Sequence, residues 1–161
     1  MVSVPPLDPE QAAPSLAELG RHHRILRDDF ASEWMQIRVV KVEPGEAVIQ
    51  MPLRREMLNG FGIAHGGMVF AFADTAFALA CNDPEHDDDT VTVASGVDVN
   101  FIRPAHAGQT LTAHARAVHT GRSGVYDIEV FAQGPEDPEP VRITLFRGRS
   151  RTIPRPGARR D

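Results

Sequence analysis

A chain of 161 residues is long enough to form one domain with a sizeable core. Its hydrophobic content of 42% and charged content of 24% are ordinary for a globular protein. The net charge of −5 argues against a nucleic-acid partner, and a single cysteine excludes an internal disulfide framework. We find no internal repeat and no linker. We therefore expect a single domain over residues 1–161, with its core at about 35–153 and flexible termini.

The proline-rich start lacks the basic residues and the apolar stretch of a secretion signal. The longest apolar run, residues 68–81, is shorter than the ~20 residues of a membrane span. We expect a cytoplasmic protein with no membrane partner.

The spacing of apolar residues predicts an amphipathic N-terminal helix over about 10–27. Strands are predicted at 35–42 and 46–52, followed by a loop at 53–64 and the long apolar helix. After an acidic loop at 83–89, alternation with a period of two predicts a strand at 91–101. The remaining predicted strands lie at 109–119, 125–133 and 140–153, and a frayed tail follows from residue 154.

The long helix is apolar nearly all round, so it must be buried on most of its faces. A single helix is covered in that way only if a sheet curls around it, and its five alanines would allow the sheet to approach closely. The sequence thus predicts an α+β fold with a central helix wrapped by a curved antiparallel sheet.

Asp74 interrupts this apolar helix. A carboxylate at such a position loses hydration worth several kcal/mol unless a neighbour compensates. Phe70 and Phe77, four and three positions away, should make its surroundings dry and raise its pKa. Two interpretations stay open: a structural carboxylate held by backbone or arginine, and a functional acid.

Asn59, His65, Gly66 and Gly67 stand just before the helix. Two glycines at a helix start leave backbone N–H groups accessible, and these groups together with the helix dipole can hold a negative oxygen. This is the outline of an oxyanion hole. The alternative is a tight turn that needs glycine only for packing.

The run from Asn59 through His65-Gly66-Gly67 to Asp74-Thr75-Ala76-Phe77 resembles the hotdog-fold acyl-CoA thioesterases, and most of all their phenylacetic-acid-degradation (PaaI) type. Later segments carry the same resemblance: Val93–Pro104, Gly124–Asp127 and Leu145–Arg149. It covers about residues 35–153. It implies a hotdog fold, hydrolysis of an acyl-CoA thioester with an aryl or arylacetyl group, and a homodimer paired into a homotetramer.

The resemblance also implies roles for individual residues. The Gly66 amide would hold the thioester carbonyl oxygen, and Asp74 would act as general base or nucleophile. Asn59 would position the same region or the attacking water, and His65 would shape the loop and hydrogen-bond near the acyl group. Ser95, the one polar residue on an apolar strand face, would be a partner for the water or for Asp74, and Thr75 would assist. The substrate-binding candidates are Gly67, Phe70, Arg103 and Arg122, the two arginines for the phosphates of coenzyme A.

A distance estimate supports a site shared by two subunits. Gly66 and Asp74 are eight positions apart, which is roughly 12 Å along a helix. Both groups therefore cannot reach one carbonyl from the same chain, and a homodimer would be required.

Other functions would need other residues. The seven histidines show no metal-ligand spacing, so we expect no metal, and no cofactor apart from the coenzyme A of the substrate. An acyl-CoA hydratase or dehydratase of the same fold would need a histidine opposite the buried acid. A non-catalytic acyl-CoA-binding regulatory module would not need the acid at all.

Overall fold

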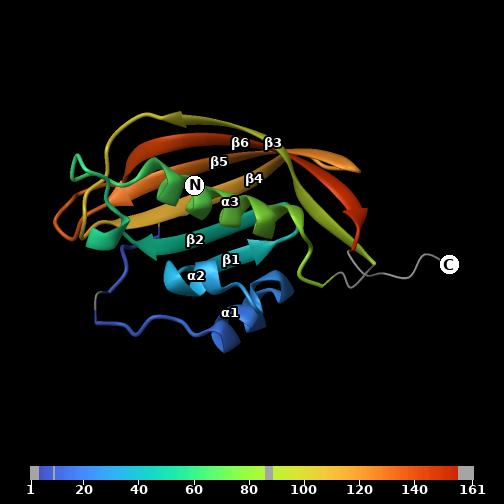
Figure 1. Ribbon diagram of the computed structural model, residues 1–161, viewed down its shortest axis with the longest axis horizontal. Helices are drawn as coiled ribbons and strands as arrows, with labels where there is room; N and C mark the ends of the chain where they lie inside the picture. Colours follow the sequence, from blue (N-terminus) through green and yellow to red (C-terminus); the bar gives the residue numbers. More distant parts are fainter. Residues whose placement is uncertain (1–3, 9, 86–88, 156–161) are drawn as a thin grey trace.

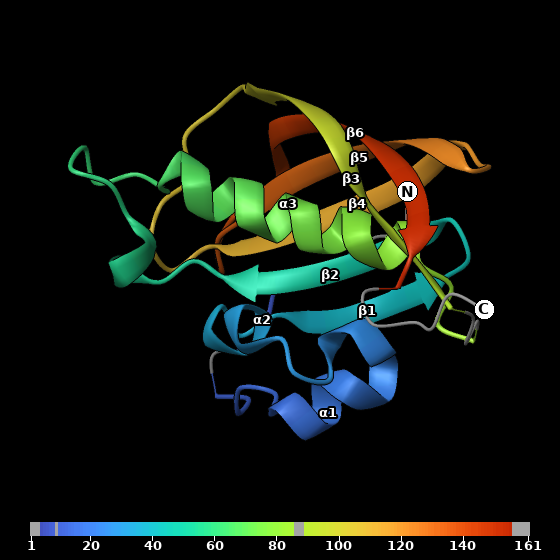
Figure 2. The same ribbon diagram turned by 45° about the vertical axis from the view of Figure 1, so that its right-hand side comes forward.

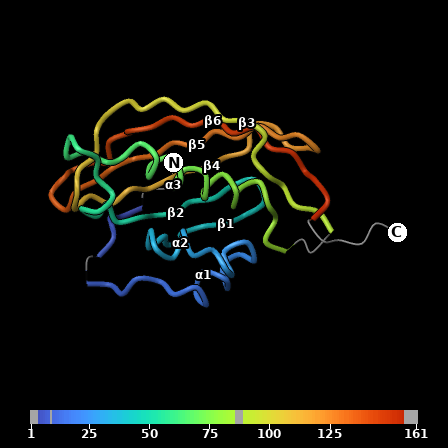
Figure 3. The backbone as a smooth tube through the Cα atoms, viewed as in Figure 1, coloured from blue at the N-terminus to red at the C-terminus, as the bar shows by residue number. Residues whose placement is uncertain are grey.

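The computed structural model describes residues 4–8, 10–85 and 89–155. The long helix α3 (Gly66–Cys81) lies along an antiparallel sheet that curves around it (Figure 1 and Figure 2). The six strands follow in the order β1 (Arg38–Glu43), β2 (Glu46–Pro52), β4 (Thr110–His119), β5 (Ser123–Gln133), β6 (Val141–Pro154) and β3 (Thr90–Phe101). The backbone trace in Figure 3 shows the same wrapping. The predicted α+β arrangement is confirmed.

The sheet covers only one side of α3. The buried residues of the helix share that side: Val69, Phe72, Ala73, Ala76, Phe77, Leu79 and Ala80. On the other side Phe70 is 37% exposed and Asp74 is half-buried. The expectation that the helix is buried on most of its faces is therefore wrong for a single chain, because the curved sheet leaves one apolar side uncovered.

Close packing of α3 on β6 depends on Gly148. A Cβ atom at this position would lie 2.7 Å from Cζ of Phe77, whose side chain is only 1% exposed. Because this ring cannot move aside, we expect Gly148→Ala to destabilise the fold by about 1–3 kcal/mol. Thermal unfolding should then show a Tm lower by roughly 2–12 °C. Gly60→Ala is the control, since nothing lies within 4 Å of its added Cβ. Equal Tm values for the two variants would contradict this packing.

The end of α3 is fixed to its neighbours by Asn82. Its Nδ2 donates to the carbonyl oxygens of Ala78 and Thr92, each at 2.9 Å, and its Oδ1 accepts from the Thr92 amide at 3.0 Å. His23 Nε2 donates to the Asn82 carbonyl at 3.0 Å, while its Nδ1 accepts from the Ile25 amide. One residue thus joins the helix, the edge strand β3 and the N-terminal segment.

The N-terminal helix is shorter than predicted. The structure has α1 (Leu16–His22), a 3-10 turn η1 (Arg24–Leu26) and a separate α2 (Phe30–Trp34) beside β1 (Figure 2). A capping box of Ser15 and Glu18 fixes the start of α1.

The first strand also starts later than predicted. Gln36 has a positive φ of 57°, which no regular strand contains, so β1 begins at Arg38 instead of residue 35.

A β-bulge in β3 overturns the predicted strand face. The register with β6 shifts between Ala94 and Gly96, which leaves Ser95 as the extra residue. Opposed residues of an antiparallel pair share a face, so Val97, opposite the buried Gly148, faces the helix, whereas Val93, opposite the exposed Arg151, faces away. The valines before and after Ser95 therefore lie on opposite faces, and one continuous apolar face over residues 91–101 does not exist.

The described part of the proline-rich start is bonded to the sheet. Gln50 Nε2 donates to the Pro5 carbonyl at 2.7 Å, and the Leu7 amide donates to Thr110 Oγ1 at 3.0 Å. At the other end β6 extends to Pro154, where a tail was predicted. The predicted flexible termini at 1–3 and 156–161, and the centre of the acidic loop at 86–88, lie outside the described residues. None of the described helices is long and apolar enough to cross a membrane.

Candidate active site

The start of α3 presents a backbone N–H group to the surface. His65 is the N-cap, and its Nδ1 accepts from the Gly67 amide at 3.0 Å. The His65 carbonyl accepts from the amides of Met68 and Val69. Within the described part of the chain, the Gly66 N–H is left without a partner. It lies at the positive end of the helix dipole, where a developing negative oxygen is stabilised.

Positions 66 and 67 are occupied by glycine for different structural reasons. A Cβ at position 67 would lie 3.1 Å from Nδ1 of His65, so Gly67 makes room for the capping imidazole. The nearest neighbour of a Cβ at position 66 would be the ring of Phe101, with Cζ at 3.3 Å. Because the Phe101 side chain is 58% exposed, its ring could give way.

A pocket of about 450 Å³ lies at this helix start. It is lined by Asn59, Ile63, Gly66, Phe101, Ile102 and Arg103, among others. The pocket brings together three of the predicted site residues, one from the loop, one from the helix and one from the segment after β3.

Asn59 holds the loop in front of the helix. Its Oδ1 accepts from the amides of Phe61, at 2.9 Å, and Ile63, at 3.4 Å, and its backbone bonds to Gly62 and Ile63 close the turn. This leaves the side-chain NH2 group of Asn59, and not its side-chain carbonyl oxygen, as the group that can bond to a ligand.

Asp74 lies on the uncovered side of α3. Burial raises the pKa of its carboxyl above the ordinary value of 3.8. No described residue donates a hydrogen bond to it, so the backbone or arginine partner that the structural interpretation requires is missing from the described residues. Neighbouring Thr75 donates its hydroxyl to the Ala71 carbonyl at 3.1 Å and is thereby used within the helix.

The raised pKa of Asp74 predicts how the hydrolysis implied by the resemblance should depend on pH. If Asp74 acts as a base, it must be ionised, so the rate is lost as the pH falls through its raised pKa. We expect the acid limb of kcat/KM to lie above the ordinary value of 3.8. A pH profile of thiol release, with thermal unfolding measured at each pH, separates this limb from acid unfolding. An acid limb at or below the ordinary value would contradict the dry environment.

The other predicted site residues do not all lie close to one another. Ser95 is exposed on the bulge, and its Oγ donates to the Arg149 carbonyl at 3.0 Å, so in one chain it serves the β3–β6 pairing. The expectation that Ser95 shares one face with the apolar residues of the strand is wrong because the bulge changes the alternation. Arg103 lines the Gly66 pocket and donates from Nη1 to the Arg142 carbonyl at 3.1 Å.

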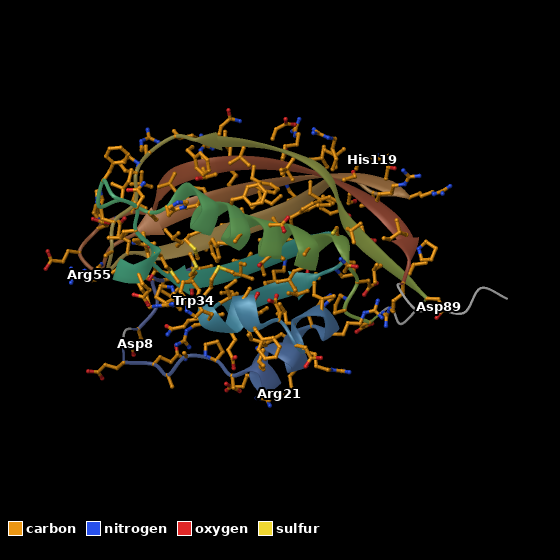
Figure 4. All side chains as sticks on the ribbon, in the orientation of Figure 1. Asp8, Arg21, Trp34, Arg55, Asp89 and His119 are labelled. Atoms are coloured by element: carbon orange, nitrogen blue, oxygen red, sulfur yellow. The ribbon has the colours of Figure 1, made fainter. Side chains whose placement is uncertain are left out.

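Arg122 lies away from this pocket. It is exposed in the turn between β4 and β5, and its carbonyl accepts from the Thr152 amide. Figure 4 shows how far this turn is from the site loop. It labels His119, at the end of β4 just before the turn, and Arg55, in the 3-10 turn η2 (Arg55–Met57) just before the site loop. The two labelled residues lie at opposite ends of the molecule. One chain therefore does not place Arg103 and Arg122 in the same pocket.

Phe101 was not predicted as a site residue. The alternation of β3 marks it as one more apolar strand residue, and nothing in its spacing shows that its ring covers Gly66. Only the folded arrangement of the strand end and the helix start reveals the contact.

Comparisons with known proteins agree with this geometry. Residues 61–139 match the pattern of the thioesterase superfamily. Acyl-coenzyme A thioesterase PaaI of Escherichia coli is 39% identical over 132 residues, which cover 81% of this chain and 88% of that protein. The chain therefore belongs to the hotdog-fold acyl-CoA thioesterases of the PaaI type, which confirms the resemblance.

Solved structures show the same relationship. The structure of the E. coli PaaI protein from the phenylacetic acid degradation operon is 37% identical, with a TM-score of 0.73 over 86% of this chain and 96% of that one. A mutant of the phenylacetic acid degradation protein PaaI from Thermus thermophilus is 34% identical, with a TM-score of 0.65 over 76% of this chain and 97% of that one.

Proposed function

We propose that this thioesterase hydrolyses phenylacetyl-CoA or ring-hydroxylated phenylacetyl-CoA at sites shared by two subunits. One observation carries the proposal: α3 holds the N–H of Gly66 and the carboxylate of Asp74, neither with a partner among the described residues, roughly 12 Å apart along the helix. Both groups suit one reaction, yet one chain cannot bring them to one carbonyl. The arylacetyl group is supported by the two PaaI relatives named for phenylacetic acid degradation.

The shape of the chain supports a dimer. At one edge of the sheet β1 is flanked by α1 and α2 (Figure 2), whereas the twelve-residue strand β3 forms the other edge with no strand beyond it among the described residues. A long free edge is a template for pairing with a second copy. Pairing there would also place a second helix against the uncovered side of α3, with Gly66 of each chain near Asp74 of the other. Two such dimers would form the tetramer.

The reaction follows from these groups. The Gly66 N–H donates a hydrogen bond to the thioester oxygen, on which negative charge develops as the carbonyl carbon is attacked. In one route Asp74 of the other subunit takes a proton from the attacking water, the C–S bond breaks, and the thiolate of coenzyme A takes a proton as the free acid leaves. In the other route Asp74 attacks the carbonyl itself, the C–S bond breaks to give an anhydride and the thiolate of coenzyme A, and water then hydrolyses the anhydride to release the free acid. His65 fixes the loop, and the Asn59 amide orients the acyl group or the water.

The experiment is thiol release from a panel of phenylacetyl-, hydroxyphenylacetyl-, benzoyl-, short-chain and long-chain CoA esters. The chain's own thiol does not interfere, because burial raises the pKa of Cys81 to about 12. We expect the highest kcat/KM for the arylacetyl esters. Release only from aliphatic esters would overturn the substrate class. Binding without any release would point to a hydratase or a regulatory module.

A further inference from the structure

The ring of Phe101 lies at the start of α3. It lies over Gly66, where a Cβ would come within 3.3 Å of Cζ, 3.5 Å of Cε2 and 3.7 Å of Cε1, and its side chain is 58% exposed. It also lines the pocket that contains Asn59 and Arg103. An apolar ring therefore forms one wall of the pocket that Gly66 also lines.

Such a wall offers an aromatic face or edge beside the acyl group of a thioester held at Gly66. Aromatic pairs in offset or edge-to-face contact attract each other more than their buried area alone explains.

We propose that Phe101 is a specificity-determining residue whose ring contacts the acyl group and favours aryl over aliphatic thioesters. This inference rests on the proposed function, because it assumes that the thioester carbonyl is held by Gly66. Phe101 takes no part in proton transfer and makes no bond with the substrate. Its effect lies in the choice between substrates.

The test compares kcat/KM for phenylacetyl-CoA and butyryl-CoA in Phe101→Ala and Phe101→Leu. We expect the aryl-to-aliphatic ratio to fall about 5- to 10-fold in both variants, since neither keeps the ring. A ratio measured on one preparation does not depend on the fraction of folded protein. Phe30→Ala is the matched control: Phe30 is 67% exposed on α2, outside the pocket, and its loss should leave the ratio unchanged.

A double-mutant cycle with Gly66→Ala tests whether the ring is the agent. The added methyl keeps the N–H and pushes against the ring, so it should lower the ratio when Phe101 is present and have little further effect in Phe101→Ala. Additive effects, or an unchanged ratio in Phe101→Ala, would overturn the inference while wild-type turnover of acyl-CoA leaves the proposed function standing. A wild-type protein that releases no thiol would overturn the proposed function instead.

Discussion

Asp74→Asn should lower kcat/KM for acyl-CoA hydrolysis by about 10²- to 10⁴-fold, the range for loss of a general base, and keep the fold. Asparagine has the shape of the carboxyl group but cannot take a proton from water. The matched control is Asp28→Asn, an exposed acid in the N-terminal segment, which should retain the wild-type rate. Steady-state thiol release from the most active ester of the panel measures both variants.

The same substitution should stabilise the protein at neutral pH. Burial raises the folded pKa of Asp74 above its ordinary value of 3.8, so above that folded pKa the ionised carboxylate destabilises the fold. As the pH falls below the ordinary value, this destabilisation disappears. Asp74→Asn should thus unfold at a higher Tm than wild type at pH 7.5 and lose that advantage in acid. A variant that keeps wild-type turnover, or that loses activity together with its fold, would contradict the assignment.

Gly66→Pro should be the second severe loss, about 10²- to 10³-fold in kcat, because it removes the N–H that is assigned to the oxyanion. The position tolerates proline for two reasons. Gly66 is the first helical residue, where the missing N–H breaks no helix bond. His65 before it has φ −65° and ψ 127°, the extended conformation that a residue preceding proline adopts.

Gly66→Ala provides the comparison, because it adds a Cβ that meets the Phe101 ring just as proline does but keeps the N–H. We expect it to lose less than about tenfold, far less than proline. Circular dichroism and Tm should be similar for the two variants. Equal losses of kcat in the two would mean that the Cβ, and not the N–H, is responsible, and the oxyanion role of Gly66 would be wrong.

The central helix and the strand run could be predicted because their apolar patterns are long. The errors arose where one residue changes the local geometry. Ser95 forms a bulge that reverses the faces of β3, and Gln36 takes a positive φ that delays β1. Neither a serine nor a glutamine indicates a bulge or a positive φ in a single sequence. The apolar residues all round α3 predicted burial on most faces, yet the sheet of one chain covers only one side of the helix.

The candidate site was predictable where the chemistry is local in sequence. His65-Gly66-Gly67 forms a cap and leaves one N–H open within four residues, which the glycine pair indicated. Contacts between distant segments were not predictable. Phe101 reaches Gly66 from the end of another element, and Asn59 uses its carbonyl inside its own loop. The distance along the helix carried the dimer hypothesis, because it follows from helix rise alone.

Subunit complementation between Gly66→Pro and Asp74→Asn tests the shared site most directly. The two variants, each carrying a different affinity tag, are co-expressed, and the mixed dimer is purified through both tags. If Gly66 of one subunit acts with Asp74 of the other, one site of each mixed dimer is intact, and about half of the wild-type kcat should return. If both groups act from the same chain, each chain carries one defect, and the mixed dimer should be as inactive as its parents.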